Sequence, residues 1–224
     1  MQHGAVQVIS CPTRAVDPGT TLSLMVLSDG PEGCAAVDVS SGALVRARYT
    51  GSPPAPLAPF DLVRVVIAED PDCPDPTQPE AVSVTGVPER LARLRGRRVR
   101  RLVGPLMLPA GEQPFGFAGS AAQYWTVPGD RPSLAVLSPQ RPPTVRDRGQ
   151  ADVVCRFGWG GVDLELPVAD QRLRQAARGG SRPLLGGPDL RQLVGFEPSL
   201  VVLALSDPQD GRCYKVVAGF LPRP

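Results

Sequence analysis

The sequence contains very little histidine and lysine, which limits its possible chemistry. Among 24 basic residues only Lys215 is a lysine, and His3 is the only histidine. A Ser-His-Asp or Cys-His catalytic arrangement would therefore have to use His3. The sequence also lacks G-x-x-x-x-G-K and any G-x-G-x-x-G that opens a helix after a strand, the usual phosphate-binding loops of ATPases and dinucleotide enzymes. We expect a binding protein rather than an enzyme.

Long apolar runs and closely spaced cysteines are absent as well. No run of about 18 apolar residues is present, and the first ten residues lack the basic start and apolar stretch of a secretory signal. We therefore expect a cytoplasmic protein without membrane contact. The five cysteines include no pair at the spacing of a metal knuckle, so we expect reduced thiols, no metal and no cofactor. They are Cys11, Cys34, Cys73, Cys155 and Cys213.

Proline and glycine, by contrast, are abundant. The chain of 224 residues has 27 prolines and 24 glycines, a density that favours short strands and turns over long helices. We therefore predict a mostly β protein. Short apolar runs separated by turn residues predict an N-terminal OB-like barrel over residues 1–88. The runs are AVQVIS, LSLMVLS, CAAVDVS, ALVRARY, DLVRVVIAE and AVSVTGV.

The last part of the chain predicts a second barrel over residues 132–224. Strands are expected at SLAVLS, VVCRFGW and VDLELPV, a helix at ADQRLRQAA, and two further strands at SLVVLALS and CYKVVAGF. This order, with a helix between the third and fourth of five strands, is typical of an OB fold, which binds oligonucleotides or sugars. An SH3-like barrel is the alternative topology.

Charge is distributed unevenly along the chain. Residues 1–89 hold four arginines and eleven acidic residues, whereas residues 90–156 hold twelve arginines and four acidic residues. The stretch RLARLRGRRVRR, from Arg90 to Arg101, has seven arginines and could bind a polyanion. Two alternatives remain open: a solvated helix face, and neutralisation by the acidic first part of the same chain.

A basic connector of helix and loop is predicted over residues 89–131, between the two barrels. Pro88 followed by ERLARL predicts a helix with Leu91 and Leu94 on one side and Gly96 as its end. The remainder predicts an ordered loop held by an aromatic cluster.

Before this connector, the acidic stretch EDPDCPDPTQPE has enough oxygen ligands for a hard cation, but its prolines favour a solvated loop.

Several strings resemble the bacterial dual-OB domain proteins. CRFGWGGVDLELPVADQRL and LVVLALSDPQDGRCYKVVAGFLP resemble the C-terminal part of that family, and ALVRARYTG, LAPFDLVRVVIAEDP, QPEAVSV and RPSLAVLSP follow the order of its other landmarks. Ala169 stands where the family has threonine. The resemblance implies two OB modules and a role in nucleic-acid recognition or processing, in mobile or defence systems, without a known reaction.

The predicted function is binding of single-stranded or unpaired DNA or RNA through the connector and the loops of the second barrel, among them SPQRPPTVRDRGQ between its first two strands. Asp163 and Glu165 are expected on the outward side of one strand of that barrel, where they would oppose binding. A protein-protein adaptor is the alternative, and a nucleic-acid-modifying enzyme is a third hypothesis. Predicted phosphate contacts are Arg95, Arg97, Arg98, Arg100, Arg101, Arg141, Arg146, Arg148 and Lys215, with Trp159 as a stacking platform unless, like Phe157, it lies in the core.

Overall fold

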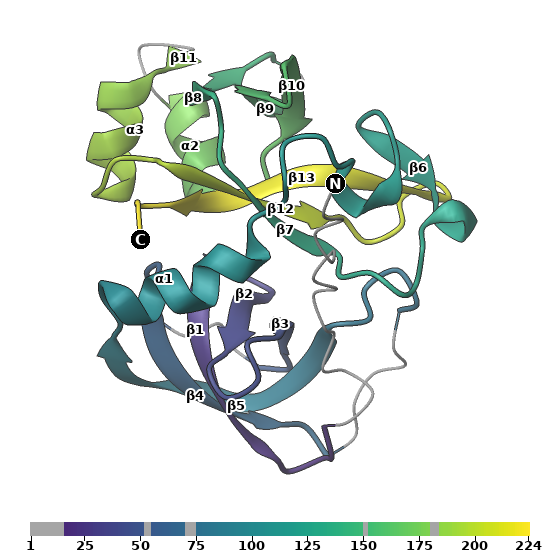
Figure 1. Cartoon of the computed structure of the whole chain (residues 1–224), viewed down its shortest axis with the longest axis vertical. Coiled ribbons are helices and arrows are strands. Elements are labelled where there is room, and N and C mark those ends of the chain that lie inside the picture. Colours follow the sequence, from purple (N-terminus) through teal and green to yellow (C-terminus); the bar gives the residue numbers. More distant parts are fainter. Residues whose placement is uncertain (1–15, 52–54, 70–74, 150–151, 180–183) are drawn as a thin grey trace, which may run out of the picture.

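Five strands close into a barrel in the first part of the chain (Figure 1). The barrel order is β1-β2-β3-β5-β4, in which β3 and β5 are parallel and the other pairs are antiparallel. A mostly β protein is thus confirmed. The strands are β1 (Thr21–Gly30), β2 (Gly33–Asp38), β3 (Leu44–Tyr49), β4 (Asp61–Ile67) and β5 (Ala81–Arg93). The structure, a computed structural model, describes residues 16–51, 55–69, 75–149, 152–179 and 184–224, so the strand expected at 5–10 lies outside them.

Strand β5 continues through Pro88 to Arg93, so the helix predicted from the sequence after Pro88 is wrong. The pairing of β4 with β5 shifts register in this region, and β5 has more residues than its partner there. Proline is tolerated at such a bulge because its missing N–H is not needed in the ladder. Helix α1 (Arg97–Val103) begins instead after Gly96, whose φ of 56° suits glycine.

The second part of the chain, from β6 to β13, contains two four-stranded sheets, ordered β10-β9-β8-β11 and β6-β13-β12-β7. A parallel bridge between Val168 and Val217 joins them. The predicted strands and helix of this part are present. The elements from α1 onward are η2 (Gly104–Leu106), η3 (Pro114–Gly116), β6 (Ala121–Gln123), η4 (Tyr124–Thr126), β7 (Leu134–Leu137), β8 (Arg141–Asp147), β9 (Val153–Trp159), β10 (Val162–Pro167), α2 (Gln171–Gly179), β11 (Leu184–Leu185), α3 (Gly187–Val194), β12 (Leu200–Leu205) and β13 (Arg212–Leu221).

Strand β8 occupies a stretch that the sequence predicted to be a loop, and this prediction is wrong. The stretch contains Pro142 and Pro143, which argue against a regular strand. The structure accommodates both prolines where the register of β8 against β9 shifts, between Arg141 and Thr144. Helix α3 and the short strand β11 were also not predicted.

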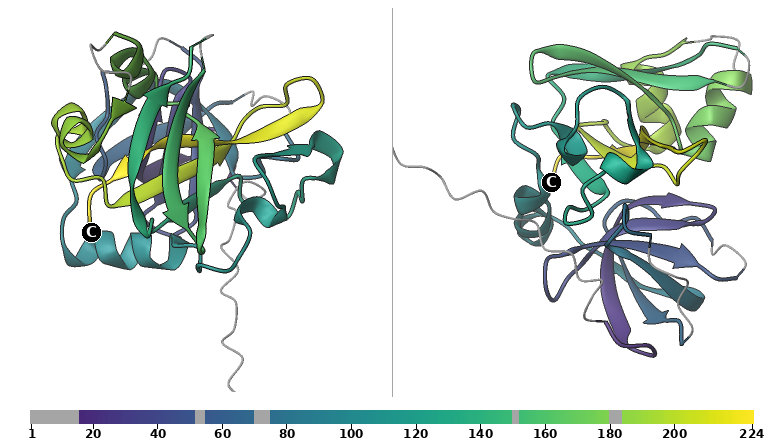
Figure 2. Two further views of the ribbon diagram at one scale, coloured as in Figure 1. Left: turned by 90° about the horizontal axis from the view of Figure 1, so that it is seen from above. Right: turned by 90° about the vertical axis from the view of Figure 1, so that its right-hand side faces the viewer.

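The two parts share one apolar core at their junction. Met25 and Leu27 of β1, Leu102 of α1, and Val202 of β12 belong to the same buried cluster. Helix α1 therefore lies against both parts, and Figures 1 and 2 show it beside the junction. At the crossing of β13 over β1, a Cβ on Gly219 would lie 2.9 Å from the Cβ of Ser28, so these two strands approach closely.

Polar side chains reinforce this junction. Arg46 donates to the carbonyl oxygens of Leu205 (2.9 Å) and Ser133 (3.3 Å). Arg48 donates to Asp207 at 2.8 Å. Glu80 belongs to the acidic stretch that was expected to be a solvated loop, but it is fully buried and accepts from Ser133. The last carboxylate of that stretch is therefore a structural group.

Candidate nucleic-acid interface

Helix α1 carries arginines on the side opposite its packed side. Val99, Leu102 and Val103 are buried in the junction. At about 100° per residue, the four arginines of the helix fall on an outward arc of about 160° that excludes these three positions. Together with the arginine before Gly96 they form a surface that we call the α1 arginine face. Its members are Arg95, Arg97, Arg98, Arg100 and Arg101.

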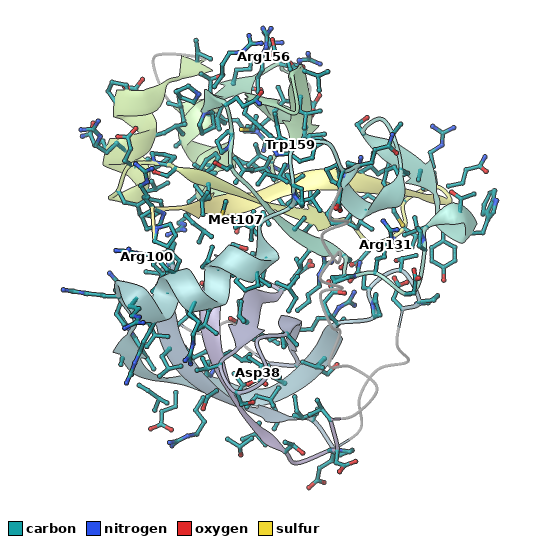
Figure 3. All side chains as sticks on the ribbon, in the orientation of Figure 1. Asp38, Arg100, Met107, Arg131, Arg156 and Trp159 are labelled. Atoms are coloured by element: carbon teal, nitrogen blue, oxygen red, sulfur yellow. The ribbon has the colours of Figure 1, made fainter. Side chains whose placement is uncertain are left out.

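All five residues of the α1 arginine face are exposed. Within the described part of the chain, none of them forms an ion pair. Neutralisation by the acidic first part is therefore not seen among these residues. Figure 3 shows Arg100 beside α1, at one edge of the molecule. The structure thus places four of the five predicted connector arginines on one open side of α1, and the fifth, Arg95, is exposed two residues before the helix.

The first two arginines of the same run are held differently. Arg90 and Arg93 donate to the buried carboxylate of Asp61 at 2.9 and 2.8 Å. Burial raises the pKa of Asp61, but the hydrogen bonds from Arg93 and from the backbone N–H of Ala58, with the charges of both arginines, more than offset it, so this pKa lies below its ordinary value. The run therefore divides into two structural arginines and five that form no ion pair with the residues the structure describes.

The arginines predicted for an exposed loop of the second part are instead paired across a sheet. Arg141 and Arg146 lie on β8, and Arg148 follows it. Arg141 pairs with Asp163 at 3.0 Å, Arg146 pairs with Glu165 at 2.8 Å, and Arg148 also pairs with Glu165. These guanidinium groups are therefore partly neutralised, in contrast to those of α1.

The aromatic residues considered for base stacking lie in the core of the second part. Phe157 is 1% exposed and Trp159 is 5% exposed, and both belong to one buried cluster. Both side chains therefore lie in the core, which was the alternative to base stacking. A base cannot stack on Trp159 in this arrangement. Among the described residues, Trp125 of η4 is the aromatic side chain with large exposure, at 70%.

Lys215 is buried and serves an internal contact. Its Nζ donates to the carbonyl oxygen of Phe117 at 2.7 Å and lies 4.3 Å from the centre of the Phe117 ring. Burial lowers the pKa of Lys215 to about 8. The lysine thus fastens the segment around Phe117 to β13, and its ammonium group is not directed at solvent. Because Phe117 lies far from it in sequence, no local pattern could have identified this partner.

A cleft of about 980 Å³ lies between the two parts. Its walls come from the β1–β2 turn and β3 on one side, and from the start of α2 and the β12–β13 hairpin on the other. Carboxylates outnumber cationic groups in its lining, so the cleft does not favour a polyanion. The acidic residues are Asp29, Glu32, Asp152, Asp170 and Asp207, and the basic residues are Arg46, Arg48 and Arg174.

The described cysteines are buried thiols. Cys34, Cys155 and Cys213 are free and lie in β2, β9 and β13. Burial raises the pKa of Cys34 and of Cys155 to about 12. Both thiols are therefore protonated near neutral pH and unreactive as nucleophiles. Cys11 and Cys73 lie outside the described residues.

Comparison of the chain with protein-family models, with curated proteins and with solved structures gives no match. The resemblance to the dual-OB domain proteins therefore stays a prediction. Among the described residues, no helix has the length and apolar character needed to cross a membrane.

Proposed function

We propose that this protein binds nucleic acid through the α1 arginine face, by contacts with the phosphate backbone. The observation that carries the proposal is the presence, among the described residues, of four exposed guanidinium groups without ion pairs on helix α1, with a fifth, Arg95, two residues before it. Guanidinium is a planar fork that matches the geometry of phosphate oxygens, and it stays charged at any physiological pH. The surrounding core holds the helix in place, so the surface is formed before a ligand arrives.

The strand order supports an OB-like interpretation of both parts. In the first part, a five-stranded closed barrel with β3 parallel to β5 has the connectivity of a Greek-key barrel. In the second part, β7 and β8 are consecutive in the chain but belong to different sheets: β7 pairs with β12, and β8 pairs with β9. We therefore interpret β7 and β8 as the two halves of one bent first strand. The parallel bridge between Val168 and Val217 then corresponds to the parallel pairing of β3 with β5 in the first part.

The proposal is restricted to phosphate contact because the predicted stacking platform is missing. Preference for single strands usually depends on aromatic side chains that stack on bases. Trp159 is buried, and Trp125 lies in the lobe of β6 and η4, away from α1 (Figure 1). We therefore expect binding to single-stranded and duplex nucleic acid with little sequence preference.

A binding titration with charge-matched variants tests the proposal. The test variant is Arg98→Ala/Arg101→Ala, which removes two unpaired cations from α1. The control is Arg64→Ala/Arg191→Ala, which removes two cations that form exposed ion pairs elsewhere. Fluorescence anisotropy with a labelled oligothymidylate at 100 mM salt should show binding that is about tenfold weaker for the test variant and nearly unchanged for the control.

The adaptor alternative predicts a different result in the same titration. An adaptor whose α1 arginine face docks on an acidic protein would show no measurable affinity for the oligonucleotide at 100 mM salt. Equal weakening of binding by the two double variants would instead indicate an effect of net charge alone. Either outcome would remove the support for nucleic-acid binding through α1.

A further inference from the structure

We infer that the outer face of the β8–β9–β10 sheet is a second anion-binding face, on which two carboxylates of β10 occupy positions that phosphate groups can take. We call it the bracketed face, because each carboxylate pairs with two arginines. Asp163 pairs with Arg141 at 3.0 Å and with Arg156 at 2.8 Å. Glu165 pairs with Arg146 and Arg148 in the same way.

The bracketed face keeps an excess of positive charge. It holds four arginines and two carboxylates, which leaves a local charge of +2 by that count. The side chains of Arg141 and Arg156 are 66% and 56% exposed, so solvent and ligands reach them. Each guanidinium carries five N–H donors, and a carboxylate uses only one or two of them. The arginines therefore retain donors for a further anion.

The register of the strands builds this arrangement. The hairpin at Gly160 and Gly161 places Glu165 opposite Arg156, and Asp163 opposite Gly158. Arg141 lies opposite Gly158 on the other side of β9. A Cβ at residue 158 would come within 3.1 Å of Arg141, so the glycine leaves room for that side chain.

The geometry indicates the class of ligand. A carboxylate held between two guanidinium forks makes the charge-assisted hydrogen bonds that a phosphate group makes with paired arginines. Asp163 accepts from Arg141 and Arg156 and is also stabilised by their charges, so it acts as an internal substitute for an external anion. The ligand that fits four partly exposed guanidinium groups on one face is a chain of phosphodiester groups, as in a nucleic-acid backbone.

The bracketed face is a different surface from the α1 arginine face. Figure 3 shows Arg156 at the top of the molecule and Arg100 at the side, next to α1. The inference shares the ligand class of the proposed function, but it depends on other residues. One can therefore hold when the other fails.

Removal of the internal carboxylates tests the inference. The test variant is Asp163→Asn/Glu165→Gln, which raises the local charge to +4 and keeps side-chain shape. The control is Glu89→Gln/Glu197→Gln, which removes two carboxylates that each pair with a single exposed arginine. The probe is a labelled oligothymidylate in a salt series, and thermal unfolding verifies that both variants are folded.

We expect the test variant to bind the probe about tenfold more tightly than the wild type at 100 mM salt, with a salt dependence that is steeper by about 0.7 for each additional phosphate that the variant neutralises. The control should change affinity by less than about twofold. Equal increases in affinity for the two double variants, or no increase for the test variant, would overturn the inference. If the double variant does not fold, Asp163→Asn alone against Glu197→Gln alone decides the question by the same criterion.

The α1 variant separates the two proposals. Combining Arg98→Ala/Arg101→Ala with Asp163→Asn/Glu165→Gln should weaken binding through α1 while leaving the higher affinity of the bracketed face intact. If the carboxylate substitutions raise affinity while the α1 substitutions have no effect in the wild type, the bracketed face stands and the proposed function of α1 falls. The opposite pattern would retain α1 and discard the bracketed face.

Discussion

The carboxylate of Glu80 accepts hydrogen bonds from Ser133, which lies 53 positions later in the chain. The backbone N–H of Ser133 donates to Oε1 and Oε2 at 2.9 and 3.0 Å, and its hydroxyl donates to Oε1 as well. Both residues are fully buried. The contact joins the end of the acidic stretch in the first part to the residue that precedes β7 in the second.

Substitution Glu80→Ala should strongly destabilise the protein. It leaves the N–H and hydroxyl of Ser133 without an acceptor in a buried site, and such losses typically total about 2–4 kcal/mol. The free energy of unfolding from urea titrations measures the effect. The control Glu89→Ala breaks an exposed pair with Arg64 and should lower stability by less than about 1 kcal/mol. Similar losses in both variants would contradict the structural role of Glu80.

Substitution Gly219→Ala should loosen the crossing of β13 over β1. The added Cβ would lie 2.9 Å from the Cβ of Ser28, and overpacking of this kind costs about 1–3 kcal/mol. Gly104→Ala is the control, because no atom lies within 4 Å of a Cβ there. Adding Ser28→Gly to Gly219→Ala should restore part of the lost stability in thermal unfolding. No recovery in that double variant would contradict the proposed crossing.

Stability should rise between about pH 8 and pH 9 because of Lys215. Burial lowers its pKa to about 8 in the folded state, from 10.5 when unperturbed. Above pH 8 the unfolded chain therefore binds more protons than the folded one, and stability increases with pH. Urea unfolding at about pH 7.5, 8.5 and 9.0 measures this rise.

Lys215→Met provides the control for this pH dependence. It removes the titrating group while keeping an unbranched side chain of similar length. The buried cysteines act in the opposite sense, because their folded pKa is raised above the unfolded value of 9.0 and stability therefore falls as pH rises above that value. The difference between wild type and variant isolates the lysine. An equal rise in both proteins would show that another group is responsible.

Much of the strand content could be predicted because alternating or apolar runs bounded by turn residues have a local physical cause. The two segments that were assigned the wrong secondary structure, after Pro88 and at β8, both contain prolines. Pro88 in β5 and Pro142 in β8 lie where strand register shifts, and such irregularities depend on the partner strand. A prediction made one segment at a time therefore mistakes a bulged strand for a helix start or a loop.

The candidate site could be predicted only in part. The density of arginines around α1 identifies them as a candidate, but whether a carboxylate neutralises them depends on the tertiary structure. For the bracketed face, a signal was present in the sequence: a two-residue hairpin at Gly160 and Gly161 fixes Glu165 opposite Arg156. The burial of Trp159 had a signal in the sequence, because its spacing of two from Phe157 places both side chains on the same face of β9.

The salt dependence of oligonucleotide binding tests the central claim most directly. The wild type and the variant Arg97→Ala/Arg98→Ala/Arg100→Ala/Arg101→Ala are compared over about 50–300 mM salt. If the four guanidinium groups bind phosphates, the plot of log affinity against log salt should be less steep in the variant by about 0.7 for each phosphate of a single strand that is no longer neutralised. Equal slopes for the two folded proteins, or no binding by the wild type at about 50 mM salt, would contradict nucleic-acid binding through the α1 arginine face.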